Sequence, residues 1–242
     1  MAGRCLSKVL TPSRKIVCEI CPFFFFLFLF FPYLCGGGDS NQEEHLRAFS
    51  ALGKISTKLA KQEATMKLSY VVFSHGKESG PMGSKIQRLM AEAKRLGLHT
   101  ISVDYRKCAT ASERVAFLDA TLRQLDTPPQ QVVLVGSSMG GYVSTVMANS
   151  LPVAGLFLMA PALWMPSEEY TVQSYQPLTS KVEITHGIND DVVPCENSIR
   201  FAREHEGTIL HLVPDDHRLK ASLDFLACQF RRFINELFEV DH

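Results

Sequence analysis

A short glycine-rich segment behind an apolar run most constrains how this chain can fold. Residues 136–140 (Gly-Ser-Ser-Met-Gly) follow the apolar run 131–135 and precede a segment of helical character that starts at Gly141. In a G-x-S-x-G pattern a buried strand ends in a sharp turn and a helix begins at once, so the central serine stands clear of the sheet. The first amides of that helix can stabilise negative charge on a substrate oxygen. The pattern therefore predicts Ser138 as a nucleophile.

An acid and a histidine follow this serine in the chain order that such a strand-turn-helix architecture uses. Asp190 lies in a turn-rich segment after the strand-like residues 182–185, with Asp191 beside it as the alternative acid. His217 follows the strand-like residues 208–213 and a polar turn. These residues predict a Ser-His-Asp triad in which the serine attacks, the imidazole transfers the proton and the carboxylate orients the imidazole.

An oxyanion hole needs two backbone donors. One is expected to be the amide of Met139, the residue after the nucleophile. The second is expected from the loop that follows the strand-like residues 69–74, where the amide of Lys77 is the candidate. We therefore expect this loop to lie beside Ser138.

Four segments of the chain resemble the alpha/beta-hydrolase superfamily. They are Ser74-His75-Gly76, residues 135–141, residues 186–194 and Asp216-His217-Arg218, and they occur in the family's order and spacing from about Leu68 to the C-terminus. Within that superfamily the chain is similar to small serine hydrolases without a lid, such as enzymes of the acyl-protein thioesterase and depalmitoylase kind. The resemblance implies a serine hydrolase with no organic cofactor and no metal ion.

Hydrophobic periodicity independently indicates alternating strands and helices. Apolar residues recur at helical spacing over 86–96 and stop at Gly97, a typical C-cap, and Thr110-Ala-Ser-Glu has capping-box spacing. The continuous apolar run 155–160 is typical of a parallel sheet with helices on both faces. The alternation predicts an α/β fold over residues 66–242, with a doubly wound, mainly parallel sheet and helices on both faces.

Only about twenty residues separate the strands expected near Pro161 and Val182, which leaves no room for a lid domain. Apolar residues of this segment, Trp164 and Met165 among them, could form a wall over an acyl pocket together with Tyr142. Packing the loop down is an equally good interpretation. The substrate-binding residues predicted by the first interpretation are Gly76, Tyr142, Trp164 and Met165.

The first 65 residues differ in character from the rest and are expected to be poorly ordered. Residues 23–31 contain only Phe and Leu, with basic residues upstream, as in a signal peptide or signal anchor, although the run is short for a membrane span. One hypothesis is export or anchoring through residues 20–35, the only place where membrane contact is expected. The other is that this block derives from a polypyrimidine tract, so that Met66 is the functional start and the catalytic domain is cytoplasmic.

Composition excludes several function classes. The formal net charge is zero, so no basic surface indicates nucleic-acid binding. Seven cysteines are an odd number, and those of the core, Cys108, Cys195 and Cys228, are scattered, which favours reduced thiols. Cys18 and Cys21 lack a second pair at zinc-ligand spacing, so no metal site is expected. Nothing in the sequence indicates an oligomeric state.

These observations favour hydrolysis of a small or acyl-bearing carboxylic ester or thioester through an acyl-enzyme intermediate. The alternative within enzymes is an amidase or peptidase of the same fold. An amide needs stronger protonation of its leaving group, and the sequence shows no sign of a recognition cleft for peptides. A hypothesis of another class is a non-catalytic hydrolase-like binding protein, which the intact set of Ser138, Asp190 and His217 disfavours.

Overall fold

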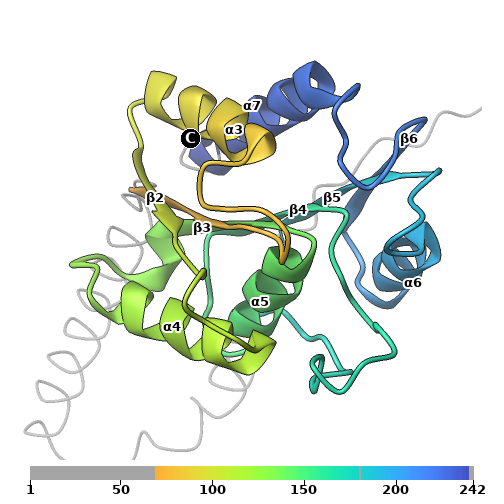
Figure 1. The fold of residues 1–242 in the computed structure, drawn as a ribbon. Coiled ribbons are helices and arrows are strands. Elements are labelled where there is room, and N and C mark those ends of the chain that lie inside the picture. The colour runs from red at the N-terminus through yellow and green to blue at the C-terminus, as the bar shows by residue number, and fades with distance from the viewer. Residues whose placement is uncertain (1–68, 180, 240–242) are drawn as a thin grey trace, which may run out of the picture. The chain divides into compact units, whose positions relative to one another are not determined.

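The computed structural model describes residues 69–179 and 181–239, in which a six-stranded sheet lies between two layers of helices (Figure 1). The strands are β1 (Tyr70–Ser74), β2 (His99–Val103), β3 (Val132–Ser137), β4 (Gly155–Met159), β5 (Val182–Gly187) and β6 (Ile209–Val213). They lie in the order β2-β1-β3-β4-β5-β6, and every pairing is parallel. Parallel neighbours need crossover connections, which contain helices here except between β4 and β5. The predicted α/β fold with a doubly wound sheet is confirmed.

Helices cover both faces of this sheet. They are α3 (Ser84–Arg95), α4 (Ala111–Arg123), α5 (Met139–Ala148), α6 (Cys195–Glu204) and α7 (Leu223–Glu239), and a 3-10 turn, η2 (Pro129–Gln131), precedes β3. In Figure 1, α3 and α7 lie on one side of the sheet, and α4 and α5 lie on the other. Leu89 and Phe230 belong to the buried cluster under α3 and α7, whereas Leu118, Val143 and Phe201 belong to the cluster under α4, α5 and α6. Each face of the sheet therefore has its own core.

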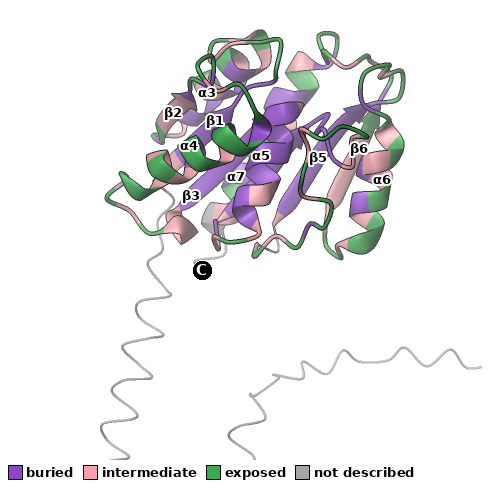
Figure 2. Ribbon diagram, turned by 60° about the horizontal axis from the view of Figure 1, so that its bottom comes forward, coloured by how far each residue is buried: buried purple, intermediate pink, exposed green. Residues whose placement is uncertain are grey.

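Burial is complete at the centre of the sheet and partial at its edges. Every residue of β3, β4 and β5 is buried, whereas most residues of the edge strands β2 and β6 are half-buried (Figure 2). A strand with helices on both faces needs apolar side chains at successive positions, which explains its continuous apolar sequence. The fixed central strands provide a rigid base for the loops at their carboxyl ends.

The local sequence patterns act largely as predicted. Gly97 follows α3 with φ of 78°, a left-handed conformation that glycine adopts without a steric cost. Thr110 caps α4, since its hydroxyl accepts a hydrogen bond from the amide of Glu113 at 3.1 Å. The Glu113 carboxylate accepts from the amide of Ala109, one residue before the position that a capping box requires. The last strand begins at Ile209, one residue later than the sequence pattern suggested.

The segment between β4 and β5 contains neither a helix nor a strand in its described residues, 160–179 and 181. The fold therefore has no inserted lid in this segment. Among the described helices, none has both the length and the apolar character that crossing a membrane requires. The predictions for residues 1–65, including the apolar run at 23–31, and the proposed start at Met66 lie outside the described residues.

Candidate active site

Ser138 stands in a strained turn between β3 and α5. Its φ of 55° and ψ of −122° are unusual for a residue with a side chain, and such strain persists only where the surroundings enforce it. Two glycines allow the strand and the helix to approach here. A Cβ on Gly136 would lie 2.5 Å from the carbonyl oxygen of Gly140, and a Cβ on Gly140 would overlap the carbonyl oxygen of Ser74. The glycines of the G-x-S-x-G pattern are thus required by backbone contacts.

Backbone hydrogen bonds hold the turn on both sides. The amide of Ser138 donates to the carbonyl oxygen of Met159 on the neighbouring strand at 3.0 Å. The carbonyl oxygen of Ser138 accepts from the amides of Gly141 at 2.8 Å and Ala162 at 3.0 Å. The main chain of the serine is therefore fixed, and its hydroxyl group projects from a rigid turn.

The structure brings together the three residues predicted to form the triad. Nε2 of His217 lies 3.0 Å from Oγ of Ser138, and Nδ1 of His217 lies 2.7 Å from Oδ2 of Asp190. A carboxylate only accepts hydrogen bonds, so Nδ1 carries the proton and Nε2 is free to accept from the serine hydroxyl. The three side chains come from the loops after β3, β5 and β6, at one edge of the parallel sheet. This arrangement can remove a proton from a serine during nucleophilic attack.

Asp190 accepts four hydrogen bonds at the end of β5. Its Oδ1 accepts from the amides of Val192 at 2.9 Å and Val193 at 2.8 Å, and its Oδ2 is shared by His217 and His186. Burial alone would raise the pKa of the Asp190 carboxyl, but the hydrogen bonds together hold it well below its usual range. The alternative acid, Asp191, is exposed. The geometry thus pairs the histidine with Asp190.

His186 is a second histidine on the same carboxylate. Its Nε2 lies 3.0 Å from Oδ2 of Asp190 and 3.0 Å from the carbonyl oxygen of Val193, so this nitrogen carries the proton. Its Nδ1 then accepts from the hydroxyl of Ser198 at 2.7 Å, and its side chain is fully buried. The sequence had given no role to His186 beyond its place in the segment 186–194. The His-Gly-x-x-Asp spacing is the one pattern that could have indicated this contact.

Close approach of the last two loops brings the acid to the histidine. A Cβ on Gly187 would overlap the carbonyl oxygen of Asp215, which itself accepts from the amide of Asn189 at 3.1 Å. Lys85, from the first turn of α3, donates from Nζ to the carbonyl oxygen of His217 at 3.2 Å. Burial lowers the pKa of Lys85 to about 8, although neighbouring carboxylates act in the opposite direction. No sequence pattern had indicated that Lys85 lies beside the site.

The loop after β1 lies against Ser138, as expected. A Cβ on Gly76 would lie 3.2 Å from the Cβ of Ser138, so only glycine approaches this closely without displacing its neighbour. The side chain of Lys77 points away to an ion pair with Glu169 at 2.9 Å, which leaves its backbone as the part that concerns the site. Met139 begins α5 with a buried side chain, and its amide is one of the helix amides that have no partner within the helix.

The aromatic residues predicted to contact substrate are largely engaged with one another. The Tyr142 side chain is only 2% exposed, and its hydroxyl accepts from the amide of Val172 at 3.1 Å. The Trp164 ring packs edge-on against Tyr175 with 4.9 Å between centroids, and its Nε1 donates to a backbone carbonyl at 2.8 Å. Met165 is half-buried in the same loop. These contacts match the interpretation in which the segment packs down on α5.

Polar residues at the two edge strands have structural partners. His211 pairs with the buried Glu183 at 3.0 Å, and Asp104 pairs with Arg106 at the end of β2. Cys108, Cys195 and Cys228 are free thiols. In residues 69–179 and 181–239, no group of three or more His, Cys, Asp or Glu side chains could hold a metal ion. The group of Ser138, His217 and Asp190 is the candidate active site in these ranges.

Comparisons with known proteins agree with the fold. Residues 71–230 match the sequence profile of the Alpha/beta hydrolase family. A comparison with curated proteins found no match. Among solved structures, one described as a hydrolase of the alpha/beta superfamily from Xanthomonas campestris pv. campestris is 27% identical. That match covers 69% of this chain and 99% of the other, with a TM-score of 0.60.

Two further structures share the fold at lower identity. Alpha/beta hydrolase domain-containing protein 10 from mouse is 22% identical over 71% of this chain and 91% of that chain, with a TM-score of 0.58. A serine hydrolase without a lid from Xanthomonas campestris is 16% identical over 70% of this chain and 82% of that chain, with a TM-score of 0.58. At this identity the likeness concerns the fold alone.

Proposed function

The chain belongs to the alpha/beta hydrolase family, and we propose that it is a serine hydrolase that cleaves a carboxylic ester or thioester through an acyl-enzyme intermediate. The observation that carries the proposal is the continuous hydrogen-bonded path from Ser138 through His217 to Asp190, with distances of 3.0 and 2.7 Å. These lengths lie within the reach that proton transfer between a nucleophile and its base requires.

The reaction proceeds in two halves. Oγ of Ser138 attacks the acyl carbon, and its proton moves to Nε2 of His217, so a tetrahedral oxyanion forms next to an imidazolium stabilised by Asp190. The imidazolium returns the proton to the departing alkoxide or thiolate, and the acyl group stays on the serine. Water then attacks the acyl-enzyme with His217 as base, and the acid is released with the free serine.

The oxyanion is stabilised by backbone amides. Met139 supplies one at the start of α5, where the helix dipole also favours negative charge. The second comes from Lys77, on the loop that Gly76 brings against Ser138. Removing one such donor costs about 10²–10³-fold in kcat in well-studied enzymes, so both positions matter for the rate.

Substrate preference follows from the leaving group. An ester or thioester releases an alkoxide or thiolate that needs little help from the acid, whereas an amide must be protonated strongly before it leaves. The open segment between β4 and β5 carries no inserted domain that would shape a cleft for a peptide. We therefore place short acyl esters and thioesters first, and amides second.

Labelling with a fluorophosphonate probe tests the proposal on the full chain. Oγ of Ser138 should displace fluoride and form a stable adduct, and Ser138→Ala should abolish labelling and lower kcat on a p-nitrophenyl ester by about 10⁶-fold. Ser137→Ala is the matched control, since Ser137 is adjacent but buried in β3, and it should keep labelling. Labelling that persists in Ser138→Ala would show that Ser138 is not the nucleophile. Parallel thioester and anilide substrates rank the three leaving groups.

A further inference from the structure

A buried arginine behind the β1 loop has no acidic partner among the described residues. Arg114, in the first turn of α4, is 5% exposed, and none of the ion pairs of residues 69–179 and 181–239 includes it. Its Nη1 donates to the carbonyl oxygens of His75 and Gly76, each at 3.3 Å, and its guanidinium lies 5.4 Å from the ring centre of Tyr105. Burying a charge is costly unless hydrogen bonds offset it, so this placement calls for a reason.

His75 holds the same carbonyl group from another side. Its Nε2 accepts from the amide of Tyr105 at 3.0 Å, so the ring proton is on Nδ1, which donates to the carbonyl oxygen of Gly76 at 2.7 Å. Burial lowers the pKa of His75, and the charge of Arg114 acts in the same direction, which favours this neutral form. The carbonyl oxygen of Gly76 therefore accepts two hydrogen bonds from buried donors.

These two hydrogen bonds fix the orientation of a whole peptide unit. The carbonyl of Gly76 and the amide of Lys77 belong to one planar trans peptide, so the N–H points opposite to the C=O. The carbonyl faces Arg114, hence the amide of Lys77 faces away from it. Gly76 itself packs against Ser138, since a Cβ placed on Gly76 would lie 3.2 Å from the Cβ of Ser138. The held peptide is thus the one that the proposed oxyanion hole uses.

We propose that Arg114 is a positioning residue for the oxyanion hole, which with His75 holds the Gly76–Lys77 peptide so that the Lys77 amide faces the oxygen of the tetrahedral intermediate. This inference rests on the proposed serine-hydrolase function. If the peptide turned over, a carbonyl oxygen would replace a donor in the hole and repel the developing negative charge. Arg114 opposes this because a turned peptide would remove one of the two carbonyl acceptors of its buried charge and leave only the carbonyl oxygen of His75.

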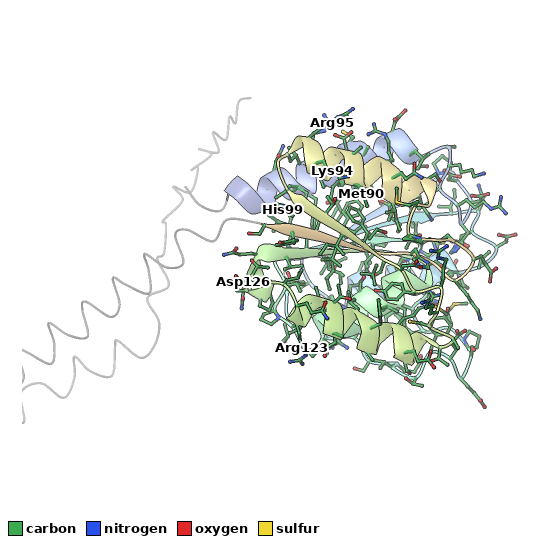
Figure 3. All side chains as sticks on the ribbon, turned by 60° about the vertical axis from the view of Figure 1, so that its left-hand side comes forward. Met90, Lys94, Arg95, His99, Arg123 and Asp126 are labelled. Atoms are coloured by element: carbon green, nitrogen blue, oxygen red, sulfur yellow. The ribbon has the colours of Figure 1, made fainter. Side chains whose placement is uncertain are left out.

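The test compares Arg114→Met with Arg123→Met in the full chain. Both arginines lie on α4, but Arg123 is 74% exposed, pairs with Asp119, and projects from the outer surface of the helix (Figure 3). Arg114→Met should lower kcat for a p-nitrophenyl ester by about 10-to-100-fold with KM nearly unchanged, which is less than the 10²–10³-fold loss of a whole donor. Arg123→Met should keep wild-type kcat.

A trifluoromethyl ketone distinguishes positioning from a merely structural role. Ser138 adds to its carbonyl carbon, the serine proton passes to His217, and the new oxyanion occupies the hole as in the reaction. Affinity for the ketone should fall in Arg114→Met by the same factor as kcat/KM, and Arg114→Lys, which restores a charged donor, should recover part of both. Unchanged ketone affinity with a lower melting temperature alone would overturn the proposal.

The result remains distinguishable from failure of the proposed function. If the wild-type chain neither hydrolyses esters nor labels at Ser138, the hydrolase proposal is wrong. If the wild type is active and depends on Ser138, but Arg114→Lys and Arg114→Met both keep full kcat/KM and ketone affinity, only the inference on Arg114 is wrong. If Arg114→Met does not fold, Arg114→Lys and Arg114→Gln are measured in its place. The proposal then requires that kcat/KM and ketone affinity fall by the same factor in each variant.

Discussion

Replacing Asp190 by asparagine separates the orienting role of the carboxylate from its place in the fold. Asparagine has the same shape, and its carbonyl oxygen can keep the hydrogen bonds that Oδ1 accepts from the amides of Val192 and Val193 at 2.9 and 2.8 Å. The second oxygen is lost. In the wild type, Oδ2 accepts hydrogen bonds from His186 at 3.0 Å and from His217 at 2.7 Å, and in the variant an NH₂ group takes its place. Two of the four groups that donate to Asp190 therefore face a donor in place of an acceptor.

The effect on the reaction follows from the tautomer of His217. Facing an NH₂ group, Nδ1 becomes the acceptor, and the proton moves to Nε2, which lies 3.0 Å from Oγ of Ser138. The imidazole can then no longer accept the serine proton. The same change in a serine protease lowers kcat about 10⁴-fold, roughly 5 kcal/mol of barrier, and we expect a similar loss for Asp190→Asn.

Folding should suffer less than catalysis. Each lost hydrogen bond to the charged group contributes about 1.5–3 kcal/mol, so the two at Oδ2 set an upper limit of about 3–6 kcal/mol on the loss in unfolding free energy. Reversal of the histidine tautomers restores part of this, because the NH₂ group then has acceptors. We expect the variant to fold and to bind substrate with nearly unchanged KM.

The assay is p-nitrophenyl ester hydrolysis for kcat and KM, together with urea unfolding for stability. Asp191→Asn is the control, since it removes the same charge from the exposed neighbour and should leave kcat within about twofold. The reasoning is wrong if Asp190→Asn keeps more than about a tenth of wild-type kcat, in contrast to the loss for triad acids elsewhere. It is equally wrong if the two variants lose the same activity.

Two further predictions concern the groups around the triad. Gly187→Ala should lower both kcat and the melting temperature, because the added methyl would overlap the backbone of the loop that carries His217. Gly80→Ala is the control, and it should change neither because there is open space around Gly80. Unaltered kinetics for Gly187→Ala would contradict this prediction. Lys85 has a folded pKa of about 8, below its unfolded value of 10.5, so the unfolded chain binds more protons between these values. The difference in unfolding free energy between the wild type and Lys85→Met should therefore increase from pH 8 to pH 10.5. If urea unfolding shows that this difference stays constant or falls over the same range, Lys85 is not buried in this way.

Much of the fold and the grouping of Ser138, His217 and Asp190 could be predicted because both depend on local chemistry. Ser138 was predictable since a strand-to-helix turn of this sharpness admits only glycine where Gly136 and Gly140 stand. Asp190 and His217 were predictable from the end of a strand-like run followed by turn residues, which locates a residue at the carboxyl edge of a parallel sheet. These inferences need only the direction of the chain and the periodicity of its side chains.

The residues that hold this site in place could not be found in the same way. Arg114 contacts the β1 loop across 38 positions of sequence, and Lys85 contacts the His217 carbonyl across 132. Such contacts depend on where α3 and α4 lie against the sheet, and no short sequence pattern predicts this placement. The two interpretations of Tyr142 could not be separated for a related reason, since an aromatic residue at this position is equally suited to line a pocket and to pack under a loop.

The strain at Ser138 and the buried charge of Arg114 have a common cause. A φ of 55° at a non-glycine residue costs about 1–3 kcal/mol, and it persists because β4 and the following loop hold the backbone of Ser138 on both sides. The guanidinium of Arg114 likewise loses its solvation on burial, and its hydrogen bond fixes the carbonyl group of Gly76. Under the proposed function, free energy of folding is given up in both places so that Ser138 and the Lys77 amide stay fixed before substrate binds. Substitutions that relax these contacts should therefore reduce kcat more than they reduce stability, and some should raise the melting temperature while activity falls.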